Sequence, residues 1–272
     1  MSFFNMFEKK SQNADREKYV EDFYKGNISF EVKEAFKTVR TNIMFATSSI
    51  EGCKKLIVTS SVAGEGKSTT SVNLALSIAQ MNSKVLLIDA DLRKPTIHKF
   101  LGIQRENGLS SALCGFISFD DCIQHTESGV DCIPAGPIPP NAAELLASEK
   151  MGELLDWAAE KYDYILVDTP PVNIVSDATI LSKYVHGTIL VARNKFTAHP
   201  SIAHAVESLE FAGAKVLGFL LNDKDISENR GYYKYGRYGY RYRYGYRYSK
   251  YGYNYSYVYG RTPETQSNEK KK

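Results

Sequence analysis

The sequence predicts an α/β protein with a doubly wound, mostly parallel sheet flanked by helices. Three observations predict this fold. A short apolar run, Leu56-Ile57-Val58, leads into a glycine-bearing loop that ends in Gly-Lys-Ser. Two further apolar runs end in aspartate, at Asp89 and at Asp168. Stretches with helical spacing separate these runs, and strands that alternate with helices build a parallel sheet.

Composition agrees with one soluble domain and two appendages. The chain has 272 residues, of which 43% are hydrophobic and 24% are charged, as in ordinary globular proteins. No stretch approaches the ~20 apolar residues of a membrane span. The four cysteines form no C-x-x-C pair, so we expect buried free thiols in a reducing compartment rather than a metal centre: Cys53, Cys114, Cys122 and Cys132.

We divide the chain into three parts. Residues 1–28 are predicted to be a flexible N-terminal segment, residues 29–228 the folded domain, and residues 229–272 a disordered tail. The domain opens with a helix within 29–48, because apolar residues recur there at intervals of three and four. Its other face carries a row of charges, Glu34, Lys37 and Arg40. On spacing alone this row is a solvated face, and the alternative is a contact with a neighbouring subunit.

The loop before the helix at 68–79 predicts a phosphate-binding P-loop, and hence a fold of the P-loop NTPase type. Its backbone N–H groups and the helix N-terminus would face the phosphates of ATP, which Lys67 would also contact. The hydroxyl of Ser68 would bind Mg²⁺. Ser61 replaces the first glycine of the usual pattern. The expected ATP-binding residues are Ser61, Val62, Ala63, Gly64, Glu65, Gly66, Lys67, Ser68 and Thr69.

Aspartates follow two of the predicted strands. Asp89 and Asp91 come after the run 85–88, and Asp168 comes after the run 164–167. Carboxyl ends of strands are where open α/β sheets place their ligands, and Mg²⁺ prefers oxygen ligands. We therefore predict a magnesium site formed by Ser68, Asp89, Asp91 and Asp168, in which one carboxylate could also accept a hydroxyl proton. The alternative for the first pair is a capped turn.

The remaining elements complete the alternation. Residues 101–124 are expected to be a loop with short helical pieces, and Trp157 to be a packing residue. Asn222, which ends the last strand, could contact a base or cap a turn, and the sequence leaves this open. The pattern predicts strands at 130–134, 187–192 and 215–222, and helices at 144–161, 177–184 and 201–212.

The tail has a composition of its own. Between Gly231 and Tyr259 it holds six basic residues, no acidic residue and 14 of the 19 tyrosines of the chain. Such a segment lacks the apolar side chains that offset the entropy of folding. It could stack on single-stranded nucleic acid, pair as strands, or be phosphorylated. The attached nucleotide site favours phosphorylation, and the expected sites are Tyr232, Tyr233, Tyr235, Tyr238, Tyr240, Tyr242, Tyr244, Tyr246, Tyr248, Tyr251, Tyr253, Tyr255, Tyr257 and Tyr259.

The ordered set of motifs resembles the bacterial tyrosine kinases, and specifically the separate cytoplasmic kinases of capsule and exopolysaccharide systems in Firmicutes. The resemblance covers residues ~30 to 260 and rests on SSVAGEGKST, LLIDADLRKP, ILVDTPP and the tyrosine cluster. It implies an ATP- and Mg²⁺-dependent protein-tyrosine kinase that phosphorylates its own tail in trans. It implies that Lys67, Asp89, Asp91 and Asp168 are catalytic, with Asp89 the favoured base.

The resemblance also implies partners. These kinases form ring-like homo-oligomers through a Glu-x-x-Arg-x-x-Arg helix motif, which favours Glu34, Lys37 and Arg40 as an oligomer interface. Lys37 stands where the family has arginine and lacks the bidentate guanidinium. A membrane-spanning activator (a polysaccharide co-polymerase) and a cognate tyrosine phosphatase are implied, with a cytoplasmic kinase recruited to the inner face of the membrane. Nucleic acid is not expected as a partner.

Two alternative functions follow from the same sequence. An ATPase switch of the partition or septum-placement type shares the fold, but it carries a second lysine where this chain has Val62. A nucleotide-gated adaptor with a nucleic-acid-binding tail would show salt-dependent binding that is lost with residues 231–259.

Overall fold

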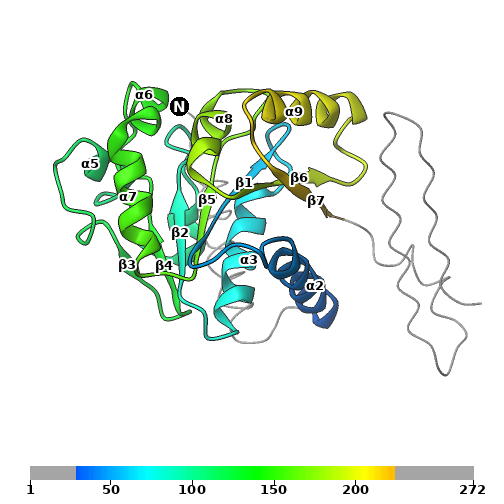
Figure 1. The fold of residues 1–272 in the computed structure, drawn as a ribbon, viewed down its shortest axis with the longest axis horizontal. Coiled ribbons are helices and arrows are strands. Elements are labelled where there is room, and N and C mark those ends of the chain that lie inside the picture. Colours follow the sequence, from blue (N-terminus) through cyan, green and yellow to red (C-terminus); the bar gives the residue numbers. More distant parts are fainter. Residues whose placement is uncertain (1–28, 224–272) are drawn as a thin grey trace, which may run out of the picture. The chain divides into compact units, whose positions relative to one another are not determined.

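The computed structural model describes residues 29–223, and within them one sheet of seven strands in the order β3-β4-β2-β5-β1-β6-β7 (Figure 1). Each neighbouring pair is parallel except β3 and β4. The predicted N-terminal segment and tyrosine tail lie outside the described residues. The strands are β1 (Lys54–Ser60), β2 (Val85–Asp89), β3 (Gln124–His125), β4 (Val130–Ile133), β5 (Tyr164–Asp168), β6 (Gly187–Arg193) and β7 (Val216–Asn222).

The central strands are buried on both faces, which explains their unbroken apolar runs. In β1, Leu56 and Val58 belong to one hydrophobic cluster and Ile57 to the other, as the two-residue period of a strand requires. The first cluster contains residues of α2, α3 and α4, and the second contains residues of α5 to α9. Helices therefore cover both faces of the sheet, as the doubly wound prediction requires (Figure 1).

The helices agree with most of the predicted ones. The short helix at 97–101 was not predicted, and the last three residues of the predicted helix 177–184 form a 3₁₀ helix. The predicted helix 144–161 is two helices that meet at Ser148, whose backbone is extended (φ −66°, ψ 154°). The Ser148 hydroxyl donates to the carbonyl of Leu145 (2.6 Å), a local bond that competes with helix continuation. The helices are α2 (Phe30–Ala46), α3 (Lys67–Ala79), α4 (Ile97–Leu101), α5 (Leu109–Leu113), α6 (Ala142–Ala147), α7 (Glu149–Ala159), α8 (Asp177–Leu181), the 3₁₀ helix η1 (Ser182–Tyr184) and α9 (His199–Phe211).

Two smaller predictions concern Trp157 and the cysteines. Trp157 packs against Phe119, with ring centroids 5.6 Å apart, so its packing role is confirmed. Three of the four cysteines are buried, but Cys114 is exposed, because it follows directly after the short helix α5 at the surface. Among the described residues no helix is long and apolar enough to cross a membrane.

Strand register brings the predicted motifs to one edge of the sheet. Asp89 and Asp168 are paired at the ends of β2 and β5. Val58 of β1 pairs with Asp168 from the other side, so the chain that leaves β1 enters its loop beside these carboxylates. The three motifs, which are up to 100 residues apart in sequence, are therefore adjacent in space.

Candidate active site

The loop between β1 and α3 has the backbone of an anion-binding turn. Gly64 and Gly66 have φ of 88° and 87°, in the left-handed region that favours glycine. Gly66 is the N-cap of α3 and no side chain caps the helix there, so the first N–H groups of α3 are left for a ligand. The helix dipole adds partial positive charge at the same point. This geometry suits phosphate groups.

Lys67 links the first motif to the other two. Its ammonium lies 3.0 Å from Asp91 Oδ2 and 3.3 Å from Asp168 Oδ2. Burial alone would lower the pKa of Lys67, but the two carboxylates raise it above its ordinary value. The lysine is therefore charged, and its charge compensates the two carboxylates.

Asp168 is the fully buried centre of this cluster. It accepts hydrogen bonds from the hydroxyls of Ser68 (2.7 Å) and Ser71 (2.8 Å). Ser71 was not among the predicted site residues, although its position one helical turn after Lys67 is a signal that could have found it. Burial raises the pKa of Asp168, while Lys67 and the two hydroxyls stabilise the ionised form. Lys67, Ser68, Asp91 and Asp168 thus form one bonded cluster.

Asp89 lies outside that cluster. It is 0% exposed, and its Oδ2 accepts hydrogen bonds from the backbone N–H groups of Thr96 and Ile97, both at 3.1 Å. Burial, together with the neighbouring Asp168, raises the pKa of Asp89 to about 8. The side chain holds the turn after β2 in place, as in the capped-turn alternative. This arrangement does not support the sequence-based preference for Asp89 as the base.

The oxygen donors fit Mg²⁺. The hydroxyl of Ser68 and the carboxylates of Asp91 and Asp168 are the hard ligands that this ion prefers. Within residues 29–223, no three acidic, cysteine or histidine side chains converge as a complete metal cage. Mg²⁺ at phosphate sites characteristically takes one or two carboxylates and completes its shell with water and phosphate oxygens. Asp89, whose Oδ2 is bonded to backbone amides, stays a predicted ligand.

The cluster opens into a pocket of about 300 Å³. Gly64, Lys67, Asp91, Pro170 and Pro171 are among the residues that line it. Arg93 also lines the pocket, held by a side-chain pair with the buried Asp177, at 3.2 Å. Sequence reasoning missed this pair, because Asp177 is far away in the chain and at the start of a predicted helix.

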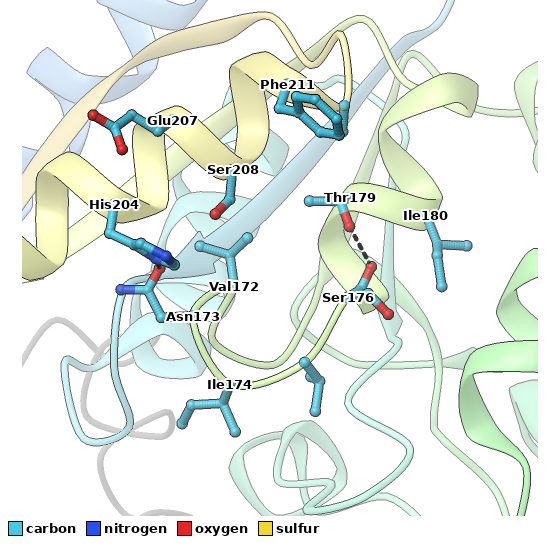
Figure 2. Close-up of a pocket in the computed structure, with 12 residues that line it drawn as sticks. Val172, Asn173, Ile174, Ser176, Thr179, Ile180, His204, Glu207, Ser208 and Phe211 are labelled. Carbon is cyan, nitrogen blue, oxygen red and sulfur yellow. Dashed lines mark hydrogen bonds between the residues drawn. The ribbon is translucent and has the colours of Figure 1, made fainter.

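A larger hollow lies beside this pocket. It is an open groove of about 760 Å³ between the segment after Pro171 and α9 (Figure 2). Figure 2 shows Ile174 on one wall and Phe211 on α9, and Ile174 also lines the smaller pocket. His204 of α9 contacts Asn173 across the groove, at 3.0 Å. The residues that line the groove include no lysine, arginine or glycine, so we place the chemistry in the smaller pocket.

The charged residues of the predicted interface row have different bonding partners. Lys37 pairs with Glu34 within α2, at 2.7 Å, and both side chains are partly exposed. Arg40 instead donates to the carbonyl of Ser77 in α3, at 2.6 Å. Phe36, Val39 and Ile43 of α2 pack on the core, whereas Phe30 and Phe45 are 72% and 75% exposed. Helix α2 therefore presents both charged and apolar side chains to the surroundings.

Comparisons with known proteins agree with this geometry. A family model described as an AAA domain matches residues 53–199. The tyrosine-protein kinase YwqD of Bacillus subtilis strain 168 is 43% identical over 207 residues, which are 76% of this chain and 86% of that protein. The putative tyrosine-protein kinase CapB of Staphylococcus aureus is 38% identical, over 80% of this chain and 93% of that protein. The solved kinase domain of the Escherichia coli tyrosine kinase ETK superposes with a TM-score of 0.69, at 36% identity, over 77% of this chain and 80% of that domain.

Proposed function

The chain belongs to the bacterial tyrosine kinases, and we propose that it transfers the γ-phosphoryl group of ATP to tyrosines in the C-terminal segment of a second copy. The observation that carries the proposal is the bonded cluster of Lys67, Ser68, Asp91 and Asp168 at the mouth of the pocket. Each member has a function in phosphoryl transfer, and the cluster lies beside an anion-binding loop.

The transfer itself needs positioning and charge compensation. The phenolic oxygen of a tyrosine forms a bond to the γ-phosphorus as the bond between that phosphorus and the β–γ bridging oxygen breaks, and ADP leaves with the electron pair. Lys67, which pairs with Asp91 and Asp168 in the structure, would turn toward the β- and γ-phosphates when ATP binds. Ser68 and Asp168 would then hold Mg²⁺, with water and phosphate oxygens completing its shell. The ion supplies positive charge that neutralises the phosphate oxygens.

The phenol proton needs an acceptor, and the arrangement supports Asp91 over Asp89. Asp91 lines the pocket, whereas Asp89 is buried behind it and bonded to backbone amides. We therefore propose Asp91 as the residue that takes the proton, and Asp89 as the residue that fixes the turn carrying Asp91.

Several partners belong to the same proposal. Exposed Phe30 and Phe45 on α2 support a ring-like homo-oligomer in which this helix, with Glu34, Lys37 and Arg40, contacts a neighbour. By its family, the kinase regulates capsular or extracellular polysaccharide synthesis and export. It would be recruited to the inner face of the membrane by a membrane-spanning activator, and its phosphotyrosines would be removed by a cognate phosphatase.

The test is mass analysis of the intact chain after incubation with ATP and Mg²⁺, with the activator fragment present. Wild type should gain phosphoryl groups, whereas Asp91→Asn should incorporate phosphate on the order of a hundredfold more slowly, because it loses a general base. Asp156→Asn, at an exposed carboxylate away from the pocket, is the control for losing one negative charge. A folded Asp89→Asn variant that is as slow as Asp91→Asn would contradict the assignment of the base. ATP hydrolysis without any gain in mass would contradict the kinase itself.

A further inference from the structure

The nucleotide-binding loop is bonded to two distant segments through Glu65. We propose that Glu65 is a positioning residue that fixes the loop in the shape that receives the phosphates. Thr197 and Asn222 contribute through their hydrogen bonds to Glu65. The inference rests on the proposed nucleotide-binding function of the loop. It assigns a function to a carboxylate that has no evident place in a site for anionic phosphates.

The carboxylate of Glu65 points into the protein. It is 1% exposed, and the hydroxyl of Ser61 lies 3.1 Å from both of its oxygens. The backbone N–H of Val62 donates to Oε2 (2.8 Å), and the hydroxyl of Thr197 donates to Oε1. These neutral donors hold the carboxylate inside the loop, and they keep its negative charge from turning toward the pocket.

These bonds explain the departure from the usual loop pattern at Ser61. A glycine there could not donate to Glu65, whereas the serine hydroxyl does. The N–H of Val62 is directed at Glu65, so this amide is not available to a ligand in the pocket. The remaining N–H groups of the loop and of the α3 N-terminus are left for the ligand.

Asn222 supplies the second connection. Its side-chain amide donates to the backbone carbonyl of Glu65, at 3.0 Å. A Cβ atom on Gly66 would lie 2.1 Å from this amide nitrogen, so Asn222 lies across the glycine directly before Lys67. The sequence left Asn222 open between a base contact and a turn cap, and the structure shows Asn222 in contact with the loop backbone.

Thr197 and Asn222 belong to one bonded unit. The Thr197 hydroxyl accepts the N–H of Arg193 (2.8 Å), and the N–H of Asn194 donates to the carbonyl of Asn222 (2.9 Å). Arg193 also pairs with Asp223, at 2.9 Å. The end of β6, the start of the β6–α9 connection and the end of β7 therefore brace the loop together, so that a change at either anchor alters the loop.

The consequence is an effect on nucleotide binding rather than on the chemical step. If only a fraction of molecules has the loop in its binding shape, the apparent dissociation constant rises in inverse proportion to that fraction. A hydrogen bond to a charged group contributes enough that its loss is expected to weaken binding on the order of tenfold. Once ATP is bound, its contacts hold the loop in the same shape, so the maximal rate should change little.

The experiment compares full-length Thr197→Val and Asn222→Ala with wild type, using calorimetric titration with ADP and Mg²⁺. The expected result is that ADP binds about tenfold more weakly to each variant and that the KM for ATP rises in parallel, while kcat stays within about twofold of wild type. Thr47→Val is the matched control, because it removes another buried threonine hydroxyl bond (to Ile43, 2.7 Å) far from the loop. It should lose a similar amount of stability, but it should bind ADP like wild type.

A double-mutant cycle tests whether Thr197 acts through Glu65. Glu65→Gln keeps the shape but leaves one oxygen acceptor where there were two. Adding Thr197→Val to it should weaken ADP binding by less than the two separate effects combined. Fully additive effects, or an unchanged ADP affinity in Thr197→Val and Asn222→Ala, would overturn the inference. The proposed function would still stand if wild type binds ADP. A wild-type chain that binds no ADP would overturn both.

Discussion

At the residue scale, Lys67 is the charge on which the site depends. Its ammonium is the cationic partner of Asp91 and of the fully buried Asp168. A buried pair is costly to break, because the remaining charge loses its compensation. The same lysine that would bind phosphate therefore also stabilises the protein before phosphate arrives.

We predict that Lys67→Met costs about 3 kcal/mol in the free energy of unfolding near pH 8, the range for removing one partner of a buried ion pair. The loss should be smaller near pH 5, because protonation then removes the uncompensated charge of the carboxylates. Urea unfolding at the two pH values measures both effects. A loss below about 0.5 kcal/mol at pH 8, the range of ordinary surface substitutions, would show that Lys67 does not hold the cluster together.

A second prediction about pH concerns His98. Burial, together with the nearby Lys99 and Arg105, lowers the pKa of this α4 side chain from 6.5 to about 4. Between about pH 6.5 and pH 4 the unfolded chain therefore binds a proton that the folded chain does not, so stability must fall as the pH falls through this window. His98→Gln should lose less stability than wild type between these pH values in urea unfolding. The same substitution at the exposed His199 is the control, and equal slopes for His98→Gln and wild type would contradict the prediction.

Residues within one motif were predictable, whereas those that act across motifs were not. The loop, Lys67, Ser68, Asp91 and Asp168 follow from local spacing, because a P-loop and a strand end are local patterns. Thr197 and Arg93 have no such signal, since their bonds to Glu65 and Asp177 join segments far apart in sequence. Which of two neighbouring aspartates faces the pocket also depends on the turn after β2, and the alternation of an extended chain does not apply there.

At the element scale, the charged row of α2 contains one residue that binds the rest of the domain and two that stay partly exposed. Arg40 fastens the helix to α3 through the carbonyl of Ser77, whereas Lys37 and Glu34 remain partly exposed. The exposed Phe30 and Phe45 lie on the same helix. The apolar spacing predicted this helix correctly, but the sequence alone could not tell which charged side chain turns back onto the domain.

We predict that Arg40→Ala and Lys37→Ala have different effects. Arg40→Ala should destabilise the monomeric domain by about 1 kcal/mol, because it removes a hydrogen bond to a charged donor. Lys37→Ala should change stability by less than about 0.5 kcal/mol, since its ion pair is exposed, but it should weaken the proposed oligomer. Urea unfolding and analytical ultracentrifugation measure the two properties. Equal stability losses, or an oligomer that Lys37→Ala leaves unchanged, would contradict this division.

At the scale of the whole molecule, the fold explains why three separate motifs form one site. A parallel sheet places the carboxyl ends of its strands at one edge, and β1, β2 and β5 are adjacent in the strand order. The alternation of strands and helices was enough to predict this edge. The break between α6 and α7 and the short strand β3 were not predicted, because both depend on local bonds and on pairing with a neighbour.

The central claim is that one copy phosphorylates the tail of another. The most direct measurement mixes a Lys67→Met chain, which keeps its tail, with an active chain that lacks residues 229–272, in the presence of ATP, Mg²⁺ and the activator fragment. Asp91→Asn serves as a second inactive acceptor that keeps the Lys67–Asp168 pair, and circular dichroism checks that both acceptors are folded. Intact-mass analysis should show phosphate on the acceptors in the mixture, and at most trace amounts on either acceptor alone. Acceptors that stay unmodified in the mixture, while full-length wild type modifies itself, would contradict transfer between copies.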